Sequence, residues 1–175
     1  MGGGSYISVI TKQQAMNRSL NPLNFPHLFF AGRTRLTLRN NEKGTHIRLK
    51  IKQKKTRIDG KLVGTEIFYL YTSILNDGDT GWEFAATYFR DTKRYRLGKE
   101  HAEGSQVHKV AHFIQQALLN PQILEDRGAA LFHEGKCCRC GMGLTHPASI
   151  MLGIGPDCIK SMPSSFISEI LSVIA

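Results

Sequence analysis

The sequence predicts an α+β fold, in which an antiparallel β-sheet built as a meander carries one packing helix and is followed by a small cysteine module and a short C-terminal helix. Three observations support this prediction. Runs of alternating side chains separated by turn residues fill the first half of the chain, one stretch with helical periodicity follows, and all four cysteines lie within residues 137–158. We expect a flexible or extended segment over 1–24, a basic antiparallel β-domain with its helix over 25–125, and the cysteine module with the C-terminal helix over 126–175.

Composition limits the class of protein. The chain has 175 residues, of which 41% are hydrophobic, and a formal net charge of +9. This length is sufficient for one core and a small additional module. No run of about 18 apolar residues occurs, so we expect a soluble protein that does not bind membranes. The charge is local, because residues 31–60 contain ten Lys and Arg against two acidic residues, and such a basic excess favours an anionic partner.

Two runs in this basic stretch have the period of two that is typical of β-strands. Arg33–Arg39 and His46–Lys52 flank the turn residues Asn40–Gly44, which predicts a β-hairpin. The expected pairs are Leu36 with Leu49, Leu38 with Ile47, Arg35 with Lys50, and Arg33 with Lys52. Like charges directly opposite each other destabilise a sheet, so this face is expected to meet a negative partner. A basic face that is merely solvated is the alternative.

The remaining elements of the domain follow in order. Leu20–Phe30 is expected to be an extended lead-in whose aromatic residues cover part of the core. Residues 54–57 continue the basic stretch into a loop that ends at Asp59-Gly60. Ile67–Leu75 predicts a central strand covered on both faces, and Trp82–Phe89 completes the meander. Ser105 is the expected N-cap of a helix that runs to about Asn120 and packs its apolar side on the sheet.

A second basic cluster lies between Arg90 and Lys99. It places Arg94 and Arg96 on either side of Tyr95, an arrangement that suits a backbone clamp with a stacking platform for bases. A hairpin tip with solvated charges is the alternative interpretation.

The cysteines predict a metal site. Cys137 and Cys140 form a Cys-x2-Cys knuckle, and Cys158 returns after a short excursion to add a third thiolate. A disulfide framework is the competing interpretation, but clustered cysteines without a signal-peptide stretch favour a metal. One structural Zn²⁺ would supply roughly 10–16 kcal/mol to a segment too small for its own core.

Structural zinc is held by four Cys or His ligands in a closed tetrahedron, so one more ligand is needed. We favour His133, because its H-x3-C spacing places the imidazole just ahead of the knuckle. Cys138 and His146 are the alternatives, although Cys138 lies inside the knuckle and is expected to point away from the metal.

The stretch 133–158 resembles a zinc-binding family of poorly defined function that is frequent in bacteriophage proteins. The family pattern is a Cys-x2-Cys-Gly-Arg knuckle, a Leu-Thr-x-Pro-x-Ser-Ile stretch and a closing Gly-x-Gly-Pro-x-Cys. This chain has Cys137–Gly141, Leu144–Ile150 and Gly153–Cys158 in those places, and it departs from the pattern at Met142 and His146.

A looser resemblance extends toward the N-terminus. Phe30–Arg33, Leu36–Leu38 and Gly44-Thr45 look like the β-rich domain that precedes the module in many such phage proteins. The resemblance implies a zinc site, a viral origin and a location in the cytoplasm of the bacterial host. It implies no reaction.

The leading hypothesis from these observations is a phage-type nucleic-acid-binding protein, for DNA or RNA, that uses a basic β-hairpin face together with a structural zinc site. Phosphate contacts of this kind carry affinity but little sequence information. The expected contact residues are Arg33, Arg35, Arg39, Arg48, Lys50, Lys52, Lys54, Lys55, Arg57, Arg94, Tyr95 and Arg96.

The alternative is a small phage effector that binds an acidic surface of a host polymerase, nuclease or defence complex and inhibits or redirects it. An enzyme is not expected, because a zinc ion with four protein ligands has no open position for water. The exception would be zinc hydrolase or deaminase-like chemistry, since Glu134 follows His133 and precedes the knuckle.

Overall fold

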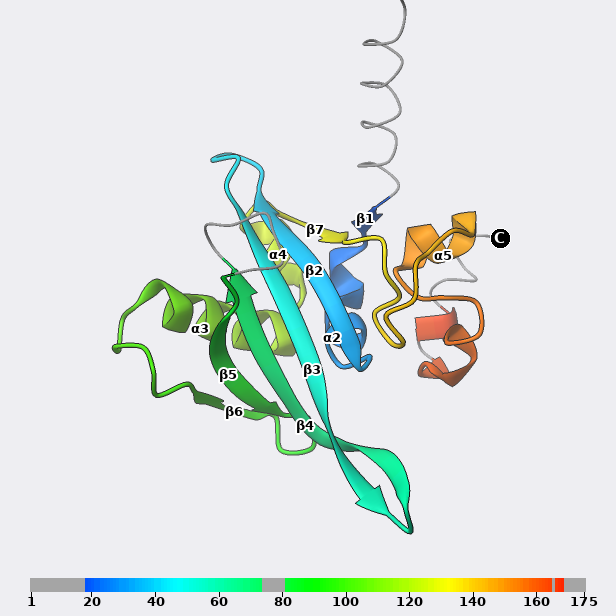
Figure 1. The fold of residues 1–175 in the computed structure, drawn as a ribbon. Helices are drawn as coiled ribbons and strands as arrows, with labels where there is room; N and C mark the ends of the chain where they lie inside the picture. The colour runs from blue at the N-terminus through cyan, green and yellow to red at the C-terminus, as the bar shows by residue number, and fades with distance from the viewer. Residues whose placement is uncertain (1–17, 74–80, 165, 169–175) are drawn as a thin grey trace, which may run out of the picture.

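The computed structural model describes residues 18–73, 81–164 and 166–168. Within these ranges the strands form one seven-stranded antiparallel sheet in the order β1-β7-β2-β3-β4-β5-β6 (Figure 1). The strands are β1 (Ser19–Leu20), β2 (Arg33–Asn40), β3 (His46–Ile58), β4 (Lys61–Ser73), β5 (Glu83–Phe89), β6 (Arg94–Leu97) and β7 (Ala129–His133). The predicted α+β class with an antiparallel meander is confirmed.

Short helices and one long helix surround this sheet. They are η1 (Pro22–Asn24), α2 (Phe25–Phe29), α3 (Gln106–Leu119), α4 (Gln122–Asp126), α5 (Pro147–Leu152) and η2 (Ile159–Ser161). Helix α3 begins where the sequence predicts it, because the Ser105 side chain accepts a hydrogen bond from the His108 N–H. Among the described residues no helix combines the length and the hydrophobicity needed to cross a bilayer.

The β2–β3 hairpin has the register that the alternation of the sequence predicts. Leu36 pairs with Leu49, Leu38 with Ile47, Arg35 with Lys50, and Arg33 with Lys52. β7 comes from the beginning of the cysteine segment and lies between β1 and β2. The chain therefore enters the cysteine module from the second strand of the sheet, directly beside β2.

The core lies between one face of the sheet and helices α2 and α3. Leu36, Leu49 and Phe68 point to this face and are fully buried. Phe29 from α2 and Ile114 from α3 meet them from the other side and are also fully buried. Burying such a side chain stabilises the fold by about 1.5–3 kcal/mol, so the apolar side of each strand is fixed and its polar side must face outward.

The lead-in is helical where an extended segment is predicted. Pro22 and Pro26 each occupy the first turn of a short helix, where the missing N–H of proline has no cost. The prediction that this segment covers the core is confirmed, because Phe25, Leu28 and Phe29 are fully buried.

Two strand predictions also need correction. β4 is covered by helices on one face only, since Phe68 and Leu70 are buried while Tyr69 and Tyr71 on the opposite face are half-buried. The basic stretch 54–57 is strand and not loop. Asp59 and Gly60 both have positive φ and form a two-residue turn of type I′ character, which extends the β3–β4 pairing to the tip.

Parts of the prediction fall outside the described residues. They are the N-terminal segment up to residue 17, the end of the predicted strand at Ile74-Leu75, and most of the C-terminal helix, from residue 169 onward.

Candidate metal centre and basic face

The structure brings three of the four cysteines together. The sulfurs of Cys137, Cys140 and Cys158 lie within 4.8 Å of one another. Cys137 is buried, whereas Cys140 and Cys158 are half-buried. All four cysteines of the chain are free thiols, so the disulfide interpretation is not realised in this structure.

Local backbone geometry produces this convergence. Gly141, with φ +79°, donates its N–H to the Cys137 carbonyl at 2.8 Å and closes the tight turn that carries Cys140 back over Cys137. Helix α5 ends at Gly153, which has a left-handed conformation and accepts a hydrogen bond from the Cys138 N–H at 2.9 Å. The segment that delivers Cys158 is thereby tied to the knuckle.

Backbone N–H groups point at the Cys137 sulfur. Gly155 donates to it at 3.2 Å and Arg139 at 3.4 Å. Burial opposes ionisation of this thiol, but the N–H groups of Gly155, Cys140 and Arg139 outweigh it and lower the pKa of Cys137. In contrast, burial and the adjacent thiols raise the pKa of Cys158 to about 12. Three thiols this close resist ionising together unless a cation compensates their charge.

The cluster fits a zinc ion. Zn–S bonds of about 2.3 Å place tetrahedral sulfur ligands about 3.8 Å apart, which is compatible with the observed grouping. Thiolates are the soft ligands that zinc prefers in structural sites. The three cysteines could therefore hold a metal ion such as zinc.

His133 does not join the group of three cysteines. It is buried at the end of β7, where its Nδ1 accepts the Gly135 N–H at 2.9 Å and its Nε2 lies 2.5 Å from the Ile150 carbonyl oxygen. Burial lowers the pKa of His133, and the charge of Arg18 adds to this effect while the Ile150 carbonyl opposes it. The imidazole is therefore a neutral connector that links β7, the knuckle loop and α5.

The two alternative ligands also lie apart from the cluster. Cys138 is fully buried and faces Thr34 and the Arg35 backbone, and burial raises its pKa to about 12. This matches the expectation that its side chain points away. His146 is exposed at the N-terminus of α5. Among the described His, Cys, Asp and Glu residues, only the three cysteines form such a group.

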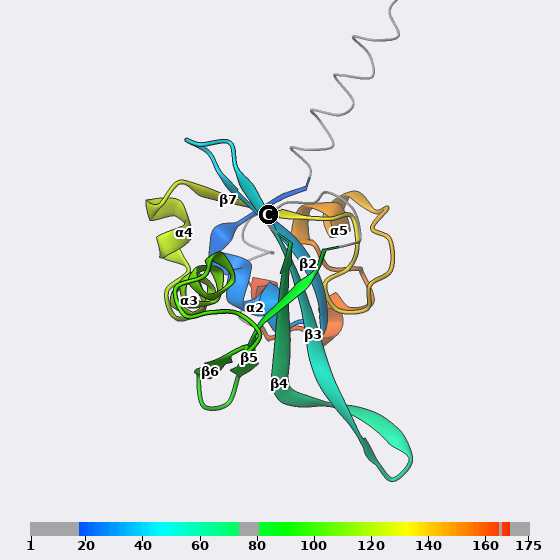
Figure 2. The same cartoon turned by 60° about the vertical axis from the view of Figure 1, so that its left-hand side comes forward.

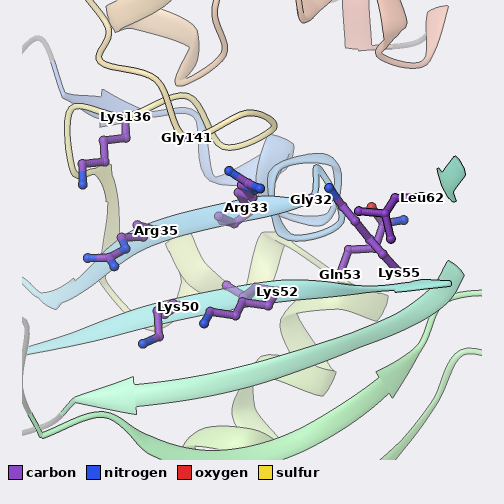
Figure 3. Close-up of a pocket in the computed structure, with 12 residues that line it drawn as sticks. Gly32, Arg33, Arg35, Lys50, Lys52, Gln53, Lys55, Leu62, Lys136 and Gly141 are labelled. Carbon is purple, nitrogen blue, oxygen red and sulfur yellow. The ribbon is translucent and has the colours of Figure 1, made fainter. Parts of the chain in front are cut away.

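A basic groove runs along the outer face of β2 and β3, opposite the helices. It has a volume of about 540 Å³ and is bounded on one side by the knuckle loop (Figure 3). Half of its twelve lining residues are cations and none is a carboxylate. The cations are Arg33, Arg35, Lys50, Lys52, Lys55 and Lys136. A neighbouring groove of about 450 Å³ shares Arg33 and Lys55 and leads to Cys140 and Cys158.

Aromatic rings lie among these cations. Trp82 has Arg48, Lys50 and Arg35 over its ring, at 4.8, 4.6 and 5.7 Å from the ring centroid. Tyr71 has Lys50 at 5.2 Å. Cations held this way keep their charge near the surface while their stems are ordered by the rings.

Arg48 has a more specific partner. Its guanidinium forms a two-fold ion pair with Glu134, at 2.6 and 3.0 Å, and both side chains are largely buried. Arg48 is one of the predicted phosphate contacts, but in this structure it pairs with Glu134, the first residue after β7. The pair connects the basic face to the cysteine module.

The other predicted contact residues are spread more widely. Arg39 lies at the far end of β2, and Lys54 and Arg57 lie on the projecting part of the β3–β4 hairpin. Tyr95 stacks on Tyr88 and is hydrogen-bonded to His112, so its ring packs within the domain. Arg94 and Arg96 lie with it on β6, at the sheet edge away from β2.

Three residues of this surface were missed by sequence reasoning. The sequence pattern places Tyr71 in a strand expected to be covered on both faces, Trp82 in the strand that completes the meander, and Lys136 next to the knuckle. The alternation of Tyr69 and Tyr71 with Phe68 and Leu70 was the available signal, because tyrosine is typical of a half-exposed strand position. Nothing local indicates that Lys136 lies over β2.

Comparison with known proteins gives one finding. A family of unknown function, DUF6011, matches residues 129–163. This segment runs from the first residue of β7 through all three clustered cysteines and includes the stretch 133–158, for which the sequence predicts a resemblance to a family of poorly defined function. No match to the chain was found among curated proteins or among solved structures. The chain is thus similar, over residues 129–163, to a family whose function is unknown.

Proposed function

We propose that this protein binds nucleic acid through the basic groove and that the cysteine cluster holds one structural zinc ion at the side of that groove. The observation that carries the proposal is the groove itself, which six cations line without any carboxylate. A phosphate backbone is the ligand that matches a continuous row of positive charge.

The strand register places the cations of the groove in pairs. Arg33 is directly opposite Lys52, and Arg35 is directly opposite Lys50. Like charges in such cross-strand pairs destabilise a sheet. A bound phosphate between each pair would convert this repulsion into charge-assisted hydrogen bonds. The register therefore supplies paired positive charges that suit a bound phosphate.

The cysteine module supplies one side of the groove. The Arg33 N–H donates to the Cys138 carbonyl at 2.8 Å, so the knuckle is attached to the first residue of β2. Lys136 and Gly141 of the knuckle loop line the groove opposite β2. When bound, zinc would fix the knuckle and hold Lys136 in place.

Intrinsic fluorescence offers a direct test. Trp82 is the one tryptophan of the chain, and it lies under the cations of the proposed surface. Titration with short DNA or RNA is expected to change its emission. If about six phosphates are engaged on a duplex, the logarithm of the binding constant should fall with the logarithm of salt with a slope near −5.

Charge-reversal variants test whether nucleic acid binds in the basic groove. The double variant Arg35→Glu with Lys50→Glu is expected to reduce affinity at least about 100-fold, since it inverts a central pair of the groove. Lys109→Glu is the matched control, because Lys109 is exposed on α3, on the other side of the sheet. Equal affinities for both variants and the wild type would contradict the proposal. An absence of nucleic-acid binding in the wild type would instead favour an acidic protein surface as the partner.

A further inference from the structure

The β3–β4 hairpin continues well beyond the sheet as a two-stranded arm. We define the arm as residues 54–64, which pair from Lys55 with Gly64 to Ile58 with Lys61. Figures 1 and 2 show it extending away from the rest of the molecule. Every residue of the arm is exposed. With five residues on its β3 side, 54–58, at about 3.3 Å per residue, its length from Lys54 to the tip is about 17 Å.

The arm has a defined base. The Gln53 side chain donates to the Thr65 carbonyl at 2.9 Å, and the Thr65 hydroxyl donates to the Lys54 carbonyl at 2.7 Å. Gln53 covers Gly64 so closely that a Cβ at Gly64 would lie 2.5 Å from its amide nitrogen. A register shift between Gln53 and Lys55 marks a bulge, which bends and twists a ribbon. These contacts set the direction in which the arm leaves the sheet.

The composition of the arm is unusual for a solvent-exposed ribbon. It carries four cations against one carboxylate. It also exposes three apolar side chains, Ile58 at 55%, Leu62 at 61% and Val63 at 41%, none of which belongs to the core. Cross-strand pairing places Arg57 beside Leu62 on one face and Lys61 beside Ile58 on the other. Both faces therefore combine positive charge with apolar surface.

We propose that this arm inserts into the major groove of double-stranded DNA while the basic groove holds the adjacent phosphates. The major groove of B-DNA admits a two-stranded β-ribbon and is about 8.5 Å deep, so the arm is long enough to reach its floor. Its cations would contact the phosphates of both strands, and its apolar side chains would contact base edges, including thymine methyl groups. This inference rests on the proposed function and specifies its ligand.

Other occupants fit the arm less well. A-form RNA has a deep and narrow major groove that side chains do not read. A second copy of the chain would bring two arms of the same charge together, which is unfavourable. The face of the arm with Lys55 and Leu62 continues directly into the lining of the basic groove, so one duplex contacts both.

A shortened arm provides the test. Deleting residues 56, 57, 62 and 63 removes two cross-strand pairs, retains the Asp59-Gly60 turn and preserves the alternation of the remaining strands. No core residue is removed, so unfolding temperature and Trp82 emission should be unchanged. Affinity for a 25-base-pair DNA duplex is expected to fall at least about tenfold, while affinity for single-stranded DNA of the same length changes less than about threefold.

A second variant separates apolar contact from charge. Ile58→Ser with Leu62→Ser keeps every cation and is expected to weaken duplex DNA binding about threefold to tenfold. Leu119→Ser is its matched control, because Leu119 is equally exposed, at 60%, at the end of α3. Binding of double-stranded RNA and the mass of each variant in solution are measured in parallel.

The outcomes are distinct. Selective loss of duplex DNA binding supports the arm proposal. The proposal would be overturned if the shortened variant kept its duplex DNA affinity, or if the wild type bound single strands or duplex RNA more tightly than duplex DNA. It would also be overturned if the deletion converted a dimer to a monomer. If the wild type binds no nucleic acid, the proposed function itself fails. If Arg35→Glu with Lys50→Glu abolishes binding but the shortened arm does not, only the arm inference fails.

Discussion

The basic groove and the cysteine cluster meet at Gly32 and Arg33, but they suit ligands of opposite charge. In the groove, cations stand opposite one another across β2 and β3, and the lining suits an anion. In the cluster, three thiols converge and need a cation before they can ionise together. The two regions are joined by the backbone hydrogen bond from the Arg33 N–H to the Cys138 carbonyl.

Loss of a cluster thiol should have the largest effect. Cys140→Ser is expected to abolish zinc binding and to unfold the knuckle, because structural zinc supplies roughly 10–16 kcal/mol to such modules. Metal content by mass spectrometry of the purified protein and thermal unfolding with and without chelator measure this. Cys138→Ser is the control, since Cys138 is buried beside Thr34 and lies outside the cluster. Retention of zinc by Cys140→Ser would contradict the assignment.

The junction of the two regions should be the next most sensitive place. Gly32 has φ +133°, and a Cβ there would lie 3.2 Å from the Arg139 carbonyl oxygen of the knuckle. Gly32→Ala is expected to cost about 1–3 kcal/mol, because backbone strain and the close contact both oppose it. Urea unfolding measures the change. Gly44→Ala is the control for a positive φ in open space, and an equal loss in both variants would show that the knuckle contact contributes nothing.

A smaller effect is expected at the ion pair that connects the face to the module. Arg48→Gln leaves a largely buried Glu134 without its partner, and we expect a loss of about 1–3 kcal/mol. Arg90→Gln breaks the pair with Glu66, which has the same 2.6 Å contact but is much more exposed, and should cost less than about 1 kcal/mol. Chemical denaturation of both variants tests the contrast. Similar losses would mean that burial does not distinguish the two pairs.

The sequence was sufficient for those features that local patterns determine. Alternation in Arg33–Arg39 and His46–Lys52 predicted the register, because one slip would move every Leu and Ile out of the core. The Ser105 cap was predicted from the residue type that precedes the helical pattern. The clustering of Cys137, Cys140 and Cys158 was predicted from the spacing of the cysteines.

What could not be predicted depends on contacts distant in sequence. β7 inserts beside β2 and brings Glu134 to Arg48 and Lys136 to the groove, and no nearby residue signals this. His133 has ligand spacing to the knuckle, yet its ring is held by Gly135 and Ile150, and the latter lies on α5. The sequence does not predict the length of the arm, because a run of lysines is typical of a loop, although Asp59-Gly60 is a strong hairpin signal.

The smallest predicted effect is the pH dependence that His133 contributes. Burial lowers its pKa in the folded protein, so the unfolded chain takes up the proton first as the pH falls. The stability that this neutral imidazole provides should be present above the unfolded value of about 6.5 and should decrease as the pH falls below it. Urea unfolding at pH 7.5 and at pH 5.5 measures the loss. His133→Gln should show a smaller difference between the two pH values, whereas the exposed control His146→Gln should keep the wild-type difference. If His133→Gln also keeps it, the imidazole is not the titrating group, and its role as a neutral connector between β7 and α5 is refuted.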